Sequence, residues 1–366
     1  MIKALSPLAS PAQRLRGGAG ARRTLCVVAV TLGALVFLVL LMIASLYLGA
    51  RSLSMGEVTS ILLHGPHHAP HSTAGAEQAG IIWDLRVPRT LLAVFAGAAL
   101  AMAGAIAQSW TRNPLADPGI IGVNAGAGFA VAVSLTVGWA TTVGHRAVAG
   151  LIGAAIAALV VLLISRVSRD PLTLVLVGVG VTFTLQAATN MLSLYSSDTL
   201  EGLRRWTVGS TAGRGMDDVL MAAVGLALGA LCAALAARPL DLLAMGEDAA
   251  RSLGGSPARA RLLAAAAVVI LAGSATATVG LVTFVGFAVP HLLRPVTGPG
   301  LTRLLVPTAV VGGAATLLAD IVGRFVLQPN ELEMSIVLAI GCAPIMVAAV
   351  RRRRGISGSK DAEVAV

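Results

Sequence analysis

The feature that most constrains this chain is a series of long apolar runs, such as 24–50 and 147–165. A helix of about 20 apolar residues is long enough to cross the hydrocarbon core of a bilayer. Only 12% of the residues are charged, whereas water-soluble domains carry roughly 25%. Charge is therefore too scarce to coat a soluble surface, and the chain is predicted to be an all-α, polytopic membrane protein.

The positions of the apolar runs predict about ten membrane-spanning helices. A basic tail at 1–23 and another at 351–366 flank a single transmembrane domain over 24–350. The expected spans are 24–50, 90–110, 119–141, 147–165, 171–195, 218–237, 259–279, 281–297, 303–323 and 334–350.

The charges are distributed unevenly between the loops of these spans. An even number of spans puts both termini on one side, and 19 of the 27 Lys and Arg residues then fall on that side, with 8 on the other. Short loops that retain positive charge face the cytoplasm. Both termini are therefore predicted to be cytoplasmic, in a cell membrane. Because the basic residues lie at the ends of apolar runs, they indicate a lipid bilayer as partner and no nucleic acid.

Several longer motifs follow one another along the chain. They are RVPRT at 86–90, RNPLADP at 112–118, LAMGEDAARSLG at 243–254, FVGFAVPHLLR at 284–294 and ADI at 319–321. In this order they resemble the FecCD-type (BtuC-like) permeases of ATP-binding-cassette (ABC) importers for iron–siderophores, haem and cobalamin, over roughly residues 57–350. The resemblance implies a ten-helix subunit that pairs with a second permease subunit, itself or a homologue. It also implies ABC ATPase subunits on the cytoplasmic face and an extracytoplasmic substrate-binding protein.

The segment 238–255 is the main cytoplasmic piece outside the spans. Its residues Leu240–Leu253 alternate apolar and charged positions and end at two glycines, which predicts a short amphipathic helix. The pattern alone also fits an ordinary connecting helix. The resemblance makes it the coupling helix that docks into the ATPase. The residues that match the family's pattern are Gly246, Glu247, Ala250, Arg251 and Gly254.

Three arginines lie at outer helix ends: Arg86, Arg89 and Arg324. The resemblance implies that they form a patch for glutamates of the binding protein, and the arginine fork suits carboxylates. The alternative is snorkelling of long side chains to the membrane interface. Asp320 is expected to pair with Arg324, which lies four residues later.

The span 171–195 is the richest in small and hydrogen-bonding side chains, and the resemblance also puts the pathway there. Thr182, Gln186 and Asn190 are predicted to line it. A cytoplasmic gate is expected where this span begins, at Pro171, Leu172 and Thr173.

Other classes of protein fit less well. An intramembrane enzyme would carry HExxH, GxSxG or paired acids, and none is present in the spans. An ion-coupled transporter would hold a carboxylate near the bilayer midplane, whereas Asp320 lies at a helix end. The tract His64–His71 has two prolines and no acid, so no metal or other cofactor is expected. The sequence thus favours a non-enzymatic permease for a ferric siderophore, with haem and cobalamin left open.

The start of the last predicted span departs from the family pattern. Glu331–Ser335 reads ELEMS, where the family commonly has ELPVG. Loss of a proline and a glycine is expected to straighten the helix start and to change its packing.

Overall fold

The structure is a computed structural model that describes residues 11–49, 53–65, 73–165, 171–327 and 330–363. Within these ranges the chain is helical and contains no β-strand. Residues 1–10 of the predicted N-terminal tail and residues 66–71 of the histidine tract lie outside the described residues. The helices are α1 (Pro11–Tyr47), α2 (Met55–His64), α3 (Thr73–Gly80), η2 (Ile81–Arg86), α4 (Val87–Thr111), η3 (Pro118–Ile121), α5 (Val123–Thr136), α6 (Val143–Ser165), α7 (Pro171–Tyr195), α8 (Ser197–Thr207), α9 (Met216–Leu243), α10 (Glu247–Ser252), α11 (Pro257–Val279), α12 (Val285–Thr297), α13 (Leu301–Val326) and α14 (Met334–Glu363).

Each predicted span corresponds to one of these helices. Seven helical segments among the described residues are long and apolar enough to cross a membrane; they belong to α1, α4, α6, α7, α9, α11 and α13. Two of the remaining predicted spans are shorter apolar helices, namely α5 and the apolar part of α14, and the third is the 13-residue helix α12. The span predicted at 281–297 starts later than expected, because α12 begins only at Val285. Phe284 before it has a left-handed φ of 70°, which interrupts a helix at that point.

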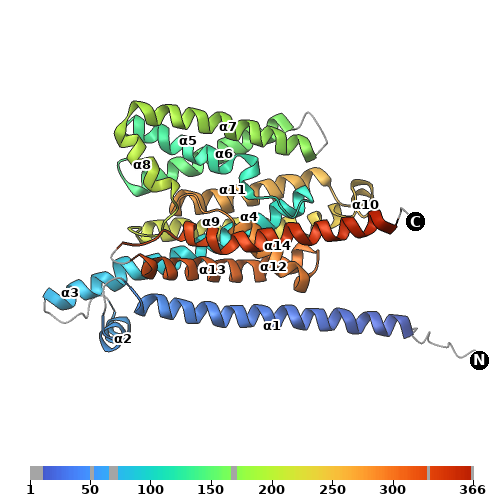
Figure 1. Cartoon of the computed structure of the whole chain (residues 1–366), viewed down its shortest axis with the longest axis horizontal. Helices are drawn as coiled ribbons and strands as arrows, with labels where there is room; N and C mark the ends of the chain where they lie inside the picture. Colours follow the sequence, from blue (N-terminus) through green and yellow to red (C-terminus); the bar gives the residue numbers. More distant parts are fainter. Residues whose placement is uncertain (1–10, 50–52, 66–72, 166–170, 328–329, 364–366) are drawn as a thin grey trace, which may run out of the picture.

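The apolar helices run roughly parallel to one another (Figure 1). α1 lies along one side of the bundle and α7 along the opposite side, while α4, α9 and α11 lie between them. α2 and α3 lie at one end, which we call the α3 end. The opposite end, where α1 begins and α14 finishes, carries α10, and we call it the α10 end.

The short helix α2 at the α3 end is started by a capping box. The Ser54 hydroxyl accepts a hydrogen bond from the Glu57 backbone N–H, and the Glu57 carboxylate accepts one from the Ser54 N–H at 2.8 Å. Hydrogen bonding of the Glu57 carboxylate by the side chain and the backbone N–H of Ser54 lowers the pKa of Glu57 below its usual value. The start of α2 is thus determined by contacts within its own segment, outside the membrane-spanning helices.

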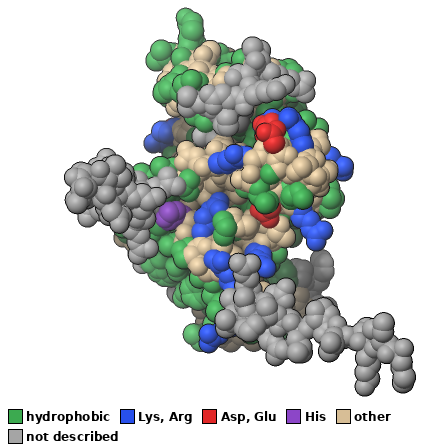
Figure 2. All heavy atoms as spheres, turned by 90° about the vertical axis from the view of Figure 1, so that its right-hand side faces the viewer, with side chains coloured by type: hydrophobic (Ala, Val, Ile, Leu, Met, Phe, Trp, Pro, Cys, Tyr) green, Lys and Arg blue, Asp and Glu red, His purple; other side chains and the backbone are tan. Residues whose placement is uncertain are grey.

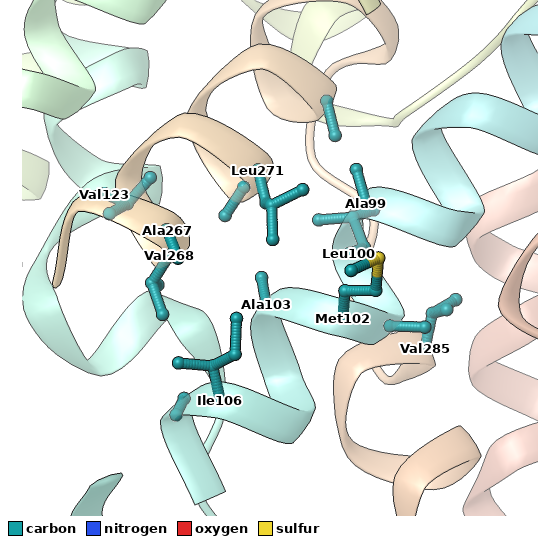
Figure 3. Packing of buried hydrophobic residues seen from close by; sticks show 14 of the residues in the cluster. Ala99, Leu100, Met102, Ala103, Ile106, Val123, Ala267, Val268, Leu271 and Val285 are labelled. Atoms are coloured by element: carbon teal, nitrogen blue, oxygen red, sulfur yellow. The ribbon is translucent and has the colours of Figure 1, made fainter. Parts of the chain in front are cut away.

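The centre of the bundle is built from small side chains. Most of α4 is buried, and alanines such as Ala99 and Ala103 face Ala267 and Leu271 of α11 (Figure 3). Between membrane helices, association depends on close van der Waals packing instead of on a hydrophobic driving force. An alanine-rich α4 therefore allows α11, α12 and α13 to approach it closely.

The tightest approach in this core joins α4 to α12. A Cβ atom added to Gly104 would lie 1.9 Å from the carbonyl oxygen of Gly286. No real Cβ atom can occupy that position, so the backbone of one helix would have to move.

We therefore expect Gly104→Ala to destabilise the chain by about 1–3 kcal/mol through overpacking. Gly33→Ala in α1 is the matched control, because an added Cβ there has no neighbour within 4 Å. Thermal denaturation of the two purified variants in detergent checks this, with a lower Tm expected only for Gly104→Ala. Equal Tm values would contradict the close approach of α4 and α12.

Candidate functional site

A buried carboxylate organises the α3 end. Asp320 of α13 is 2% exposed and accepts hydrogen bonds from two guanidinium groups. Arg89 Nε donates to both of its oxygens at 3.0 and 3.1 Å, and Arg324 Nε donates to Oδ2 at 3.1 Å. The Thr211 hydroxyl donates to Oδ1 at 2.6 Å. The expected pairing of Asp320 with Arg324 is confirmed, and Arg89 and Thr211 extend it into a network.

A second acid completes this network. Glu331, in the loop between α13 and α14, accepts a hydrogen bond from Arg89 Nη1 at 2.7 Å. Glu331 is 32% exposed and Arg89 is 15% exposed, so this ion pair lies at the outer edge of the cluster. The two positive charges of the arginines are thus paired with the two negative charges of the acids. Buried charges require such pairing, because they have lost their hydration.

Arg86 and Arg324 also cap the C-terminal end of α1. Arg324 Nη1 donates to the carbonyl oxygens of Ser45 and Leu48, both at 3.0 Å. Arg86 Nη1 donates to the carbonyl oxygens of Leu46 and Tyr47, at 2.8 and 3.1 Å. The last carbonyls of a helix lack partners within the helix and carry its negative dipole end, so two cations stabilise them.

The structure brings all three predicted docking arginines to the α3 end, but it buries two of them. Arg86 is 5% exposed and Arg324 is 2% exposed. Neither extends to solvent along an apolar surface, so snorkelling does not describe them. Of the three, Arg89 retains the most access to the surface. Sequence reasoning missed the contributions of Ser45, Thr211 and Glu331, which only the fold brings together.

At the opposite end, the predicted helix Leu240–Leu253 is divided in two. Leu240–Leu243 form the last turn of α9, and a turn separates them from α10. The break falls at Gly246, whose φ of 114° is strained for any residue with a Cβ atom. A second positive φ, 78° at Gly254, follows the helix.

The side chains of α10 divide between core contacts and solvent. Ala250 is 2% exposed and anchors the helix, whereas Asp248 and Arg251 face outward. Glu247 forms an ion pair with Arg251 at 3.2 Å and a second one with Arg261 of α11. The link to Arg261 was not predicted, because the two residues lie in different helices. It connects α10 to one of the most buried helices of the bundle.

The predicted pathway residues lie on α7, at one side of the bundle (Figure 1). Gln186 and Asn190 are exposed on this single chain, and Thr182 is half-buried. Amide side chains facing hydrocarbon are costly, so this face requires water or another protein against it. α7 begins at Pro171, where the predicted span begins. Thr173 is half-buried, and the side chains of Pro171 and Leu172 lie outside the described residues.

The changed motif at the start of α14 has a local consequence. The Ser335 hydroxyl donates to the backbone carbonyl of Val208, in the turn after α8. Serine at a position where the family commonly has glycine therefore adds a bond between α14 and this turn. Glu331 keeps its place in the ion cluster.

Helices of this length and apolarity make the chain a multi-pass membrane protein, and its fold is that of a transport permease. It superposes on a solved metal-chelate type ABC transporter in an inward-facing conformation, with a TM-score of 0.77 and 28% identity over 88% of this chain and 99% of that one.

The chain belongs to the FecCD transport family, which matches residues 29–352. It is 35% identical to the ferric enterobactin transport system permease protein FepD of Escherichia coli (strain K12), over 88% of this chain and 94% of FepD. It is 32% identical to the iron(3+)-hydroxamate import system permease protein FhuB of Bacillus subtilis (strain 168), over 91% of this chain and 86% of FhuB.

Removing the central carboxylate tests the ion cluster. Asp320→Asn leaves Arg89 and Arg324 without their shared acid, and breaking a buried ion pair costs about 3–5 kcal/mol. We expect a marked fall in the Tm of the purified chain. Glu201→Gln is the control, because the Glu201–Arg204 pair is exposed and such pairs contribute at most about 1 kcal/mol. A Tm for Asp320→Asn as high as that of the control would refute a stabilising role for the cluster.

Proposed function

We propose that this chain is the permease subunit of an ABC importer that carries a ferric siderophore, or a related large metal chelate, into the cytoplasm. The observation that carries the proposal is the family match over residues 29–352, which includes α7, α10 and the ion cluster. Relatives named as ferric enterobactin and iron(3+)-hydroxamate permeases support an iron chelate over haem or cobalamin. In this proposal the chain contributes the pathway, and ATP is hydrolysed by partner subunits.

α10 is the proposed contact with the ATPase subunits. Asp248 and Arg251 are available on its outer side, while Ala250 and Glu247 hold its inner side against the bundle. A short helix fixed in this way moves as a rigid body with α11 when a partner pushes on it. Gly246 and Gly254 allow the sharp turns on either side of it.

The exposed polar face of α7 supports a second permease subunit. Gln186 and Asn190 would face the water-filled pathway between two subunits instead of lipid. The same pairing would cover the apolar side chains that α7 exposes, among them Phe183 and Leu194. The partner in this pair is either a second copy of this chain or a homologue.

The α3 end is the proposed docking face for an extracytoplasmic substrate-binding protein. Arg89 is the most exposed of the three arginines there, and a carboxylate of the binding protein would approach it beside Glu331. Arg86 and Arg324 would support this contact from behind by fixing the end of α1.

The charge distribution supports a cytoplasmic α10 end. Lys and Arg side chains are spread over this face, whereas Asp and Glu are few (Figure 2). Basic residues concentrate on the cytoplasmic side of membrane proteins, so both termini would be cytoplasmic, in the plasma membrane.

Labelling tests this orientation. Single cysteines are introduced at Asp84, exposed at the α3 end, or at Asp248 on α10, in a chain whose own Cys26, Cys232 and Cys342 are replaced. In whole cells with a permeable cell envelope, a membrane-impermeant thiol reagent should modify only the cysteine at position 84. Modification at position 248 from outside would reverse the proposed orientation.

The coupling role is tested by reversing one charge on α10. Glu247→Lys adds a third cation beside Arg251 and Arg261, so α10 loses its fixed position on α11. Each lost hydrogen bond to a charged group changes the equilibrium between α10 fixed on α11 and α10 released from it by roughly tenfold. We expect uptake of radiolabelled iron, supplied as a ferric siderophore, to fall by at least about tenfold while ATP hydrolysis by the assembled importer persists.

Glu201→Lys is the matched control, since the Glu201–Arg204 ion pair is also exposed but lies on α8, away from α10 (Figure 1). Uptake by this variant should remain close to that of the unmodified chain. Normal uptake by Glu247→Lys would contradict the coupling role. Loss of uptake on collapse of the ion gradient, with ATP still present, would instead indicate an ion-coupled transporter.

A further inference from the structure

A pocket of about 340 Å³ opens at the α10 end, where the last turns of α4, α9 and α12 meet. Its polar lining consists mainly of Gln108, Ser109, Arg112, Asp241 and Arg294. Leucine, alanine and proline side chains form the rest of the wall. The proposed pathway and coupling contacts do not use these polar groups.

Arg294 is poorly satisfied within the chain. Its Nη2 donates to Gln108 Oε1 at 3.3 Å and its Nη1 to the Pro299 carbonyl oxygen at 3.4 Å, both long contacts. Its Nε is buried and has no hydrogen-bond partner in the described part of the chain. The Ser109 hydroxyl beside it is also buried and unpartnered among those residues. Buried polar groups ordinarily have a hydrogen-bond partner, and these two groups therefore leave two donors for a ligand.

Arg112 is the second cation of the pocket. Its backbone has a φ of 52°, a left-handed conformation that glycine or asparagine usually adopts at the end of a helix. Its guanidinium group donates to the carbonyl oxygen of Leu243, where α9 ends. Position 112 thus carries an arginine although its left-handed backbone conformation favours glycine or asparagine.

The one acid of the pocket is already engaged. Asp241 accepts hydrogen bonds from the backbone N–H groups of Leu301 and Thr302, at 2.7 and 3.2 Å, and from the Thr302 hydroxyl at 2.7 Å. It thereby caps the start of α13. Over the residues that the structure describes, neither Arg112 nor Arg294 has an acidic group within ion-pair distance. The pocket therefore carries excess positive charge.

We propose that this pocket binds a phosphate-bearing anion between Arg112 and Arg294. Guanidinium forks bind phosphate oxygens through paired hydrogen bonds, and the Ser109 hydroxyl offers one more donor. Gln108 Nε2 donates to the Gly286 and Phe287 carbonyl oxygens at 3.3 Å each, so Gln108 lies between these carbonyls and Arg294. The phosphate comes either from an anionic lipid headgroup, since the pocket lies at a bundle end, or from free phosphate.

Binding to the purified full-length chain tests this site without any transport assay. One arm reconstitutes the chain in phosphatidylcholine with or without phosphatidylglycerol, and native mass spectrometry measures the phosphatidylglycerol retained. The other arm titrates inorganic phosphate onto the chain in detergent, against chloride at equal ionic strength, and follows the Tm. The variants are Arg112→Ala, Arg294→Lys and Ser109→Ala. Arg259→Ala is the control, because Arg259 is exposed at the same end but does not line the pocket.

We expect at least one probe to bind the unmodified chain and the Arg259→Ala variant equally. Binding should weaken about tenfold in Arg112→Ala and Arg294→Lys, and by less in Ser109→Ala, which keeps both cations. Retained phosphatidylglycerol identifies a lipid headgroup, and a phosphate-dependent Tm identifies free phosphate. Absence of both, as expected if the pocket instead receives a side chain of the ATPase, would overturn the proposal. Equal weakening in Arg259→Ala would overturn it too, because that would indicate general surface charge.

Discussion

The structure at the α3 end depends on one buried carboxylate. A charge removed from water must be paired and hydrogen-bonded, and Asp320 meets this requirement through Arg89, Arg324 and Thr211. These partners come from α4, from α13 itself and from the turn before α9. Arg324 then reaches the last carbonyls of α1. A single acid therefore fixes the relative positions of segments that are far apart in the sequence.

The two ends of the molecule are joined by a core that has little freedom to deform. α4 carries Arg89 at one end and Arg112 at the other, and between them its small side chains let α11 and α12 approach closely. α11 in turn holds α10 through Arg261 and Glu247. Packed helices move as rigid bodies, so in the proposed coupling role a displacement of α10 would be transmitted along α11 to the centre of the bundle.

α7 exposes polar side chains on the outer side of the bundle. Its amide side chains face outward at membrane depth, where a hydrocarbon environment cannot satisfy them. The interior of the bundle, by contrast, is filled with alanine, valine and leucine side chains (Figure 3). In the proposed function, a pathway for a large chelate would therefore lie between two subunits and not through the middle of one.

Much of this architecture was predictable from the sequence, because apolar length and charge asymmetry are local properties of the chain. They predicted the helical class and the positions of the spans, and the i, i+4 spacing predicted the pair Asp320–Arg324. The sequence could not predict that Arg89, Thr211 and Glu331 join that pair, that Glu247 bonds to Arg261, or that Arg112 and Arg294 share a pocket. Those contacts join residues from different helices. Only the packing of small side chains along α4 and α11, which sets how closely the helices lie, decides which side chains meet at their ends.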